Sequence, residues 1–293
     1  MGMPIIEGFV VERLIKEGGF GSVYLAKRVS DKKLFAIKLV HPKFSVQLSA
    51  RMQFAKEIKL LSSLNHPYII KVQGALKDAP RPAMLMEYFE SETLKDLVIA
   101  KSPLLEEKGV GIFRKMCEAL KYLHEQKIVH KDIKPENILV AANGDVRLID
   151  FSIAEKINWW SMLKPRKREG TPLYMAPEQI KKERLDGRAD IYAMGAAFYL
   201  VFGGRAHITA GSEKALLQQH LKAQVPKLRQ FNKKVPYLLD NIILRMLNKH
   251  KEERYQSMAE VLFELNRFTT GDSMASLAKA AAQAEDAPEE KPS

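Results

Sequence analysis

The polar segment from His130 to Asn137 contains the residues with the clearest capacity for chemistry in this 293-residue chain. Within it, the carboxylate of Asp132 is free to accept a proton from a hydroxyl group. The ammonium of Lys134 can neutralise charge that develops on a transferring phosphoryl group. A polar loop with a helix-capping aspartate would have a similar composition. The segment therefore predicts phosphoryl transfer if metal and phosphate ligands converge on it.

Asn137 and Asp150 lie on either side of a predicted strand pair at 138–140 and 146–149. The two strands flank an Asn143-Gly144 turn, which favours a hairpin. An antiparallel pair brings the start of its first strand beside the end of its second, so the Asn137 amide and the Asp150 carboxylate are expected to face the same volume. Oxygen ligands of these types suit a hard cation, and we predict that the two residues hold Mg²⁺.

A glycine-rich stretch near the N-terminus contains Gly18, Gly19 and Gly21. Glycines allow backbone N–H groups to approach phosphates without a clash from a Cβ atom. Alone, such a stretch is also typical of a flexible hairpin. However, Lys38 follows on the next predicted strand, and Glu57 on a predicted helix could pair with it and hold it towards phosphates. The combination predicts a site for a triphosphate.

The segment at 170–178 begins with Gly-Thr-Pro and ends with Ala-Pro-Glu. Its last residue, Glu178, lies beside apolar neighbours, and a buried carboxylate needs a cationic partner. Arg254 is the candidate for that partner. A solvated surface turn is the alternative interpretation.

Two groups of elements must position these side chains. The first ninety residues are typical of strands with one helix. The predicted strands are 9–15, 23–27, 34–40, 72–76 and 83–87. The helix is predicted at 50–64 and is expected to stop at Asn65-His66-Pro67. After Tyr88 the pattern is mainly helical up to about residue 268, with helices at 106–124 and 191–202.

Composition and charge limit the function classes. The chain has 47 Lys and Arg against 35 Asp and Glu, a formal net charge of +12. The basic residues are spread along the chain and are not interleaved with aromatic residues, so we expect no nucleic-acid binding. The one cysteine, Cys117, excludes an internal disulfide framework and favours the reducing cytoplasm. Its spacing with Phe113 and Met116 predicts a packed core thiol.

The two ends of the chain carry no predicted functional segment. We expect no signal peptide and no membrane span, because the longest apolar run, at 191–202, is too short for a bilayer. The segment 270–293 is rich in Ala, Glu, Lys and Pro, which predicts a disordered tail or at most a transient helix. No stretch is typical of a sensor domain, so regulation by a partner in trans is expected.

Taken together, these segments resemble the protein kinase superfamily over roughly 9–268. The order matches: glycine-rich loop, strand lysine, helix glutamate, catalytic loop, metal aspartate and Ala-Pro-Glu. Lys134, two residues after Asp132, and the Gly170-Thr171 pair are similar to serine/threonine kinases rather than tyrosine kinases, and the layout resembles bacterial members. The resemblance implies an α+β, bilobal fold. A small antiparallel β-sheet N-lobe with one main helix would span about 9–88, and a larger, mainly α-helical C-lobe about 89–268.

The resemblance also implies a reaction and its residues. ATP, with Mg²⁺, would donate its γ-phosphoryl group to Ser or Thr hydroxyls of protein substrates. Asp132 would orient and deprotonate the hydroxyl, Lys134 would contact the γ-phosphate, and Asn137 and Asp150 would hold the metal. Asp190 would brace the catalytic loop, Thr171 would lie near Asp132, and the segment 150–178 would be the activation loop. The residues implied to bind ATP are Ile15, Gly18, Gly19, Phe20, Gly21, Val23, Ala36, Lys38, Glu57, Met86, Glu87, Phe89 and Leu139.

Three positions depart from the family pattern. Lys16 replaces the first loop glycine, Ser152 replaces the glycine after Asp150-Phe151, and Lys131 replaces the arginine before the catalytic aspartate. These departures leave open the alternative of a pseudokinase that acts as a nucleotide-binding scaffold. A small-molecule phosphotransferase on a related fold is a separate alternative, which the 170–178 segment disfavours. The departures also leave open whether Ser161 or Thr171 is phosphorylated in activation, because a lysine grips a phosphate less specifically than an arginine.

Overall fold

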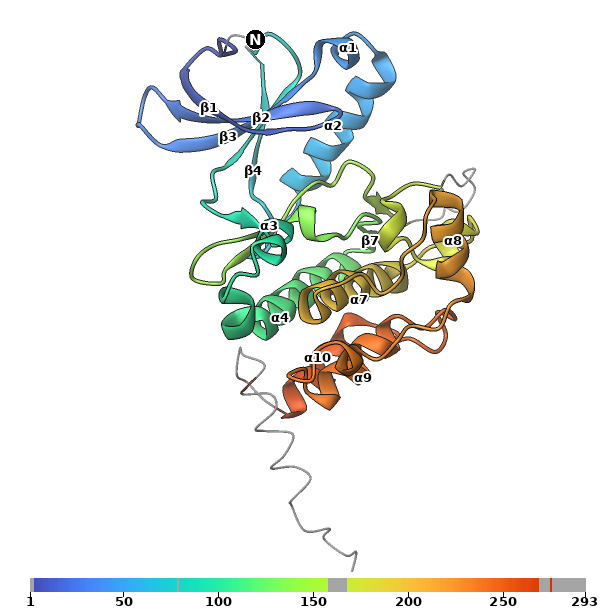
Figure 1. Ribbon diagram of the computed structural model, residues 1–293. Helices are drawn as coiled ribbons and strands as arrows, with labels where there is room; N and C mark the ends of the chain where they lie inside the picture. Colours follow the sequence, from blue (N-terminus) through green and yellow to red (C-terminus); the bar gives the residue numbers. More distant parts are fainter. Residues whose placement is uncertain (1–2, 78, 158–167, 269–274, 276–293) are drawn as a thin grey trace, which may run out of the picture. The chain divides into compact units, whose positions relative to one another are not determined.

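The computed structural model describes residues 3–77, 79–157, 168–268 and 275. The predicted tail at 270–293, apart from residue 275, and Ser161 lie outside the described residues. The chain divides into two compact units, coloured along the sequence in Figure 1. The N-terminal unit comprises Met1–Glu90 and Ile149–Ser152, and the C-terminal unit comprises Ser91–Leu148 and Ile153–Ser293.

The N-terminal unit is built on a five-stranded antiparallel sheet with the order β1-β2-β3-β5-β4. Its strands are β1 (Phe9–Glu17), β2 (Gly21–Arg28), β3 (Leu34–Val40), β4 (Val72–Leu76) and β5 (Ala83–Glu87). Ile37 and Leu39 on the central strand β3 are almost fully buried, and Phe35 adds an aromatic ring to the same cluster. Strands β3, β4 and β5 have the predicted bounds, because aliphatic and aromatic side chains favour a pleated surface with one buried face.

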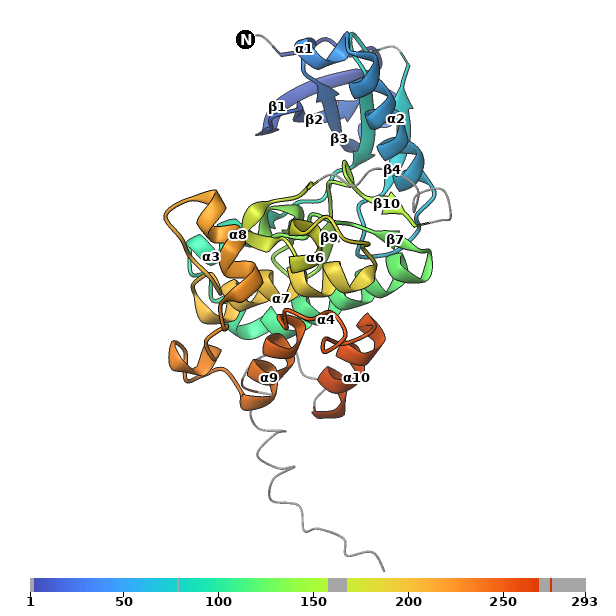
Figure 2. The same ribbon diagram turned by 90° about the vertical axis from the view of Figure 1, so that its right-hand side faces the viewer.

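Two helices follow β3 in this unit, α1 (Pro42–Ser45) and α2 (Leu48–Ser62). Figure 2 shows α2 beside β4, and its residues Phe54 and Leu61 are buried. The predicted stop at Asn65-His66-Pro67 is wrong, because α2 ends three residues before that motif. Ser63 ends the helix, since its backbone N–H and its hydroxyl both donate to the carbonyl of Leu60.

The C-terminal unit is mainly helical. Its α-helices are α3 (Leu94–Ile99), α4 (Leu104–Glu125), α6 (Pro177–Ile180), α7 (Gly187–Gly203), α8 (Glu213–Lys222), α9 (Tyr237–Met246) and α10 (Met258–Phe268). Short 3-10 helices occur at η1 (Pro135–Asn137), η2 (Pro172–Tyr174) and η3 (Leu228–Gln230). Five short strands form two small sheets, and they are β6 (Glu92–Thr93), β7 (Ile128–Val129), β8 (Ile138–Val140), β9 (Val146–Leu148) and β10 (Glu155–Lys156).

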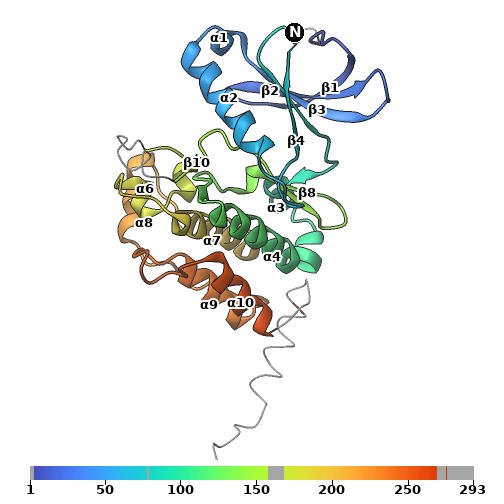
Figure 3. The same cartoon turned by 180° about the vertical axis from the view of Figure 1, so that it is seen from behind.

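The core of the C-terminal unit lies between α4 and α7, which run next to each other in Figures 1 and 3. The rings of Phe113 and Phe198 lie 4.6 Å apart, and Phe198 also contacts Phe202 at 5.7 Å. Cys117 is fully buried beside them, which confirms the predicted core thiol. Helix α7 is buried on nearly all sides, as predicted for 191–202. Among the helices that the structure describes, none combines the length and apolarity needed to cross a membrane.

The fold class expected from the sequence is confirmed. A small antiparallel sheet with one main helix forms one unit, and helices with a few short strands form the larger unit.

Candidate active site

The segment 130–137, which the sequence predicts to be a catalytic loop, follows β7 in the C-terminal unit, and one buried carboxylate fixes its start. Asp190, in the first turn of α7, accepts hydrogen bonds from the backbone N–H groups of His130 and Lys131, both at 2.9 Å. The ring Nε2 of His124 lies 3.0 Å from the same carboxylate. Burial acts to raise the pKa of Asp190, but the contacts with His124 and His130 outweigh it, so its pKa is lowered. These contacts place Asp190 where it can hold the backbone of His130 and Lys131, as the resemblance implies.

Asp132 is surrounded by donors. Its Oδ1 accepts from the Thr171 backbone N–H at 2.9 Å and from the Thr171 hydroxyl at 2.8 Å. Its Oδ2 accepts from Lys134 Nζ at 2.6 Å and from Asn137 Nδ2 at 3.2 Å. The segment that ends in η2 brings Thr171 onto this carboxylate, and the role of Asp132 as acceptor of a hydroxyl proton stays a prediction. Both oxygens thus act as hydrogen-bond acceptors in these four contacts.

Asn137 lies in η1, directly before β8, where the predicted hairpin forms with Ile138 opposite Leu148. Its amide Nδ2 donates to the Asp132 carbonyl at 2.9 Å, so its amide oxygen faces away from that bond. Amide and carboxylate oxygens are ligands that Mg²⁺ accepts, and the donor types of Asn137 and Asp150 fit this metal. The two residues belong to different units, so their role as a pair stays a prediction.

The predicted pair of Lys38 and Glu57 is confirmed within the N-terminal unit. Lys38 Nζ on β3 lies 2.8 Å from Glu57 Oε1 on α2 and 3.8 Å from Asp150 Oδ1. Burial acts to lower the pKa of Lys38, but the carboxylates of Glu57 and Asp150 raise it, so the ammonium stays charged. Burial raises the pKa of Glu57, and Lys38 offsets part of this effect. A fixed, largely desolvated cation of this kind is suited to bind phosphate oxygens.

The glycine-rich loop connects β1 to β2 in the same unit. The Gly18 N–H donates to the Gly21 carbonyl at 3.0 Å, which closes the loop on itself. His41 Nε2 lies 2.7 Å from the Gly18 carbonyl oxygen. The ring of Phe20 stacks on Phe44 of α1 at 5.3 Å, so the tip of the loop is attached to the helices of the unit. This packing was not anticipated for a residue assigned to ATP binding.

The other residues predicted to bind ATP lie mostly on the sheet of the N-terminal unit. Ala36 pairs with Met86 across β3 and β5, and both are buried. Val23 lies opposite Lys38 across β2 and β3. Ile15 lies at an irregularity of β1, Glu87 is the last residue of β5, and Phe89 follows two residues later. Leu139 lies on β8 of the C-terminal unit.

The second predicted ion pair is also confirmed. Arg254 donates to both oxygens of Glu178, at 2.7 and 2.8 Å, and both side chains are buried. The surface-turn interpretation of the 170–178 segment is therefore wrong at Glu178, because its carboxylate is inside the C-terminal unit.

Several positioning residues were missed from the sequence. Gln179 Nε2 donates to the carbonyls of Lys131 at 2.9 Å and Glu169 at 3.2 Å, so it ties the catalytic loop to the end of the 150–178 segment. Gln53 of α2 donates to the Ser152 carbonyl at 3.0 Å. No local pattern marks Gln53, whereas Gln179 next to a buried glutamate is a polar side chain that needs partners and could have been found on that basis.

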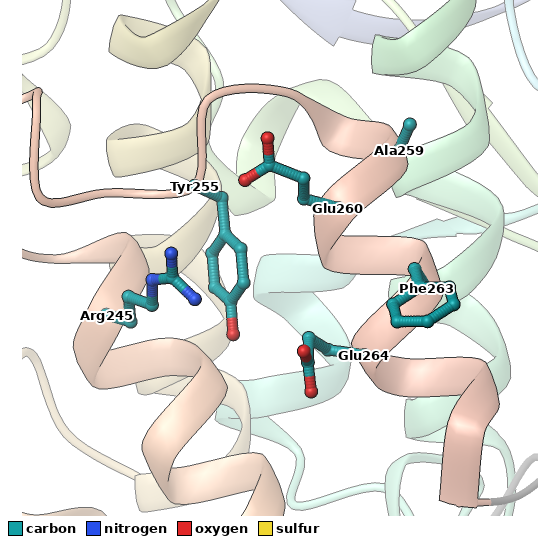
Figure 4. Close-up of a pocket in the computed structure, with 6 residues that line it drawn as sticks. All are labelled: Arg245, Tyr255, Ala259, Glu260, Phe263 and Glu264. Carbon is teal, nitrogen blue, oxygen red and sulfur yellow. The ribbon is translucent and has the colours of Figure 1, made fainter.

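A pocket of about 310 Å³ lies between α9 and α10 of the C-terminal unit (Figure 4). It contains none of the predicted site residues. Its lining includes two carboxylates, which disfavour an anionic nucleotide. The lining residues are Arg245, Tyr255, Ala259, Glu260, Phe263 and Glu264.

Comparison with known proteins agrees with this geometry. The family described as "Protein kinase domain" matches residues 9–264. The chain is 30% identical over 259 residues to serine/threonine-protein kinase PknB of Mycobacterium leprae. The matched region covers 87% of this chain and 42% of that protein. It is 29% identical over 261 residues to serine/threonine-protein kinase PrkC of Bacillus subtilis, which covers 89% of this chain and 40% of that protein. The chain thus spans about two fifths of the length of these relatives, and it belongs to the protein kinase family.

Proposed function

We propose that the chain is an ATP- and Mg²⁺-dependent serine/threonine protein kinase, with residues 9–268 as its kinase domain. The observation that carries the proposal is the contact set of Asp132, whose two oxygens are bound by Lys134, Asn137 and Thr171 at 2.6–3.2 Å. The relatives PknB and PrkC, which are named serine/threonine-protein kinases, support the same activity.

The arrangement suits in-line phosphoryl transfer to a hydroxyl. A substrate Ser or Thr hydroxyl that bonds the Asp132 carboxylate is oriented by it, and its proton passes to the carboxylate. Its oxygen forms a bond to the γ-phosphorus while the bond from that phosphorus to the β–γ bridging oxygen breaks, which releases ADP. Lys134 neutralises negative charge on the transferring group, and its 2.8 Å contact with Thr171 shows that it reaches past Asp132.

The nucleotide is assigned to the predicted ATP-binding residues. Lys38, fixed by Glu57, would bind the α- and β-phosphates, and Gly18 to Gly21 would cover them with backbone N–H groups. Asn137 and Asp150 would hold Mg²⁺, which supplies positive charge to the phosphate oxygens when it is bound. Protein substrates follow from the kinase assignment, and we retain a regulatory partner in trans and a cytoplasmic location as part of the proposal.

The Asp132→Asn variant tests the function. The amide cannot accept the hydroxyl proton, so we expect transfer from radiolabelled ATP to a generic protein substrate to fall roughly 10²–10⁴-fold. ATP affinity, measured with a fluorescent analogue, should stay within about twofold, since Asp132 is not among the predicted ATP-binding residues. Equal incorporation by both proteins would refute the proposal.

Two other results would indicate a different function for the chain. ATP binding without transfer to any acceptor would indicate a pseudokinase. Incorporation into small metabolites but never into protein would indicate a small-molecule phosphotransferase.

A further inference from the structure

We propose that Lys131 is a positioning residue held by the carboxylates of Glu155 and Glu169, and that these acids assemble the catalytic loop without a phosphate on the 150–178 segment. The inference rests on the proposed kinase function and extends it to regulation. It concerns only residues of the C-terminal unit that the structure describes.

The backbone of Lys131 is fixed from three directions. Its φ of 69° places it in the left-handed region, an uncommon conformation for a residue with a Cβ atom. Its N–H donates to Asp190, and its carbonyl accepts from Gln179, both at 2.9 Å. A Cβ atom at Gly170 would lie 2.9 Å from the same carbonyl, so the end of the 150–178 segment runs directly against this residue.

The side chain of Lys131 contacts two acidic residues within that segment. Its Nζ lies 3.1 Å from Glu169 Oε2, just before Gly170, and 3.4 Å from Glu155 Oε2 on β10. Only 10% of the lysine side chain is exposed, whereas the glutamates are 40% and 34% exposed. The ammonium is thus mostly buried, and the two glutamates are partly exposed. They can therefore be substituted without disturbing the core of the unit.

The negative charge that the two glutamates bring to Lys131 is close to that of a phosphorylated side chain. Two carboxylates supply a charge of −2, and a phosphorylated side chain supplies about −1.5 to −2 at pH 7. An arginine fork favours two oxygens of one planar group, whereas the compact ammonium of a lysine can contact two separate carboxylates. The Lys131 departure from the family arginine therefore matches its partners.

Two of the hydroxyl groups that could be phosphorylated are poorly placed for it. Between Asp150 and Glu178 the sequence offers only Ser152, Ser161, Thr171 and Tyr174. The Thr171 hydroxyl donates to Asp132 at 2.8 Å, so a phosphate there would set a dianion against the catalytic carboxylate. The ring of Tyr174 is buried, with 6% of the residue exposed.

The first experiment compares phosphate-free protein with untreated protein. The chain is co-expressed with a broad-specificity phosphatase, mass spectrometry verifies the absence of phosphate, and initial rates are measured with ATP, Mg²⁺ and a generic substrate. We expect rates within about twofold of each other. The Glu155→Gln/Glu169→Gln double variant should lose about tenfold in kcat with little change in KM for ATP, because small displacements of catalytic groups affect the transition state.

Glu213→Gln is the matched control. Glu213 pairs with Arg168 at 3.2 Å, is 59% exposed and does not contact Lys131. Its neutralisation should leave kcat unchanged. A loss of more than tenfold on dephosphorylation, reversed by rephosphorylation, would overturn the proposal.

A second readout does not depend on catalysis. Hydrogen exchange of the peptide that covers 128–134 reports the amide bonds to Asp190 directly. We expect equal protection in phosphate-free and untreated protein and at least about tenfold faster exchange in the double variant. Unchanged exchange in that variant overturns the role of the two carboxylates. Absence of phosphoryl transfer in every form would instead refute the proposed function, while the exchange result would still decide whether Lys131 is held as described.

Discussion

Individual residues at the candidate site adopt backbone conformations that their sequence context alone does not favour. Lys131 and Asp150, on either side of the short hairpin, have φ angles of 69° and 63°. Such conformations cost free energy and persist where surrounding contacts enforce them. For Lys131 those contacts are the bonds to Asp190 and Gln179. The conformational cost is therefore concentrated at residues whose side chains must point in a particular direction.

Gly21 shows how narrow the tolerance is in the glycine-rich loop. A Cβ atom at this position would lie 2.5 Å from the Leu39 carbonyl oxygen, which belongs to the backbone of β3 and cannot rotate away. We expect Gly21→Ala to lower the free energy of unfolding of the N-terminal unit by about 1–3 kcal/mol, as overpacking does. Urea unfolding followed by circular dichroism measures this change.

Gly19→Ala is the control in the same loop, because a Cβ atom at Gly19 would have no neighbour within 4 Å. It should change stability by no more than about 0.5 kcal/mol. Equal destabilisation by the two variants would contradict the steric explanation.

At the scale of elements, one buried ion pair connects several parts of the C-terminal unit. Arg254 binds Glu178 of α6 in a bidentate manner and also donates to the Arg188 carbonyl of α7 at 2.9 Å. Its guanidinium lies 4.9 Å above the ring of Tyr192. A planar fork is required for this set of contacts, and lysine cannot reproduce it.

The Arg254→Lys variant should therefore destabilise the C-terminal unit by about 3–5 kcal/mol, since Glu178 would stay buried without its bidentate partner. Thermal unfolding and urea unfolding both measure the loss. Arg168→Lys, which alters an exposed pair with Glu213, should cost less than about 1 kcal/mol. Similar losses in both variants would show that the buried pair has no special role.

Elements with strong periodicity could be predicted from the sequence, and those that depend on distant partners could not. The helix predicted at 106–124 is α4 with slightly longer ends, because its apolar residues recur at helical spacing. The strands β7 and β10 have two residues each and pair only with one another, so no local pattern marks them. Helix α3 was missed although a capping box at Thr93 and Asp96 was readable in the sequence.

The candidate site was predictable to the extent that it consists of charged pairs. Lys38 with Glu57 and Glu178 with Arg254 were identified, because a buried charge requires a partner. The resemblance also implied that Thr171 lies near Asp132, but its two hydrogen bonds to one carboxylate oxygen were not predicted, since they depend on the path of a loop 39 residues further along the chain. Contacts set by loop paths have no signature in composition or spacing.

At the scale of the whole molecule, the interior of the C-terminal unit contains a cluster of ionisable side chains. The Tyr192 hydroxyl lies 2.9 Å from His220 Nδ1, 3.3 Å from His207 Nε2 and 3.4 Å from Lys249 Nζ. Burial and the nearby Lys249 lower the pKa of His220 to about 4. Burial, His220 and Lys249 also lower the pKa of His207. Both imidazoles are therefore neutral in the folded protein at pH 7.

This cluster predicts loss of stability in mild acid. The unfolded chain protonates a histidine near pH 6.5 and the folded protein protonates His220 only near pH 4, so the unfolded state binds more protons between these values. The contribution of the neutral histidines to the free energy of unfolding is complete above about pH 6.5 and falls as the pH decreases. For His220 alone the loss is on the order of 3 kcal/mol at pH 4, and His207 adds to it.

Urea unfolding at several pH values between 7.5 and 4.5 checks this expectation. The His220→Gln variant should show a shallower decline, and His250→Gln, at an exposed position, should follow the unmodified protein. Identical slopes for the two variants would show that His220 does not cause the decline.

The burial of the single thiol gives the C-terminal unit a built-in reporter. Burial raises the pKa of Cys117 well above its usual range, and none of the residue is exposed. The reactive thiolate is therefore scarce and shielded in the folded protein, so alkylation of Cys117 follows the opening of α4. Because the sequence has no other cysteine, a cysteine introduced on the surface would carry a dye selectively, and one molecule could report both its surface motions and the integrity of its interior.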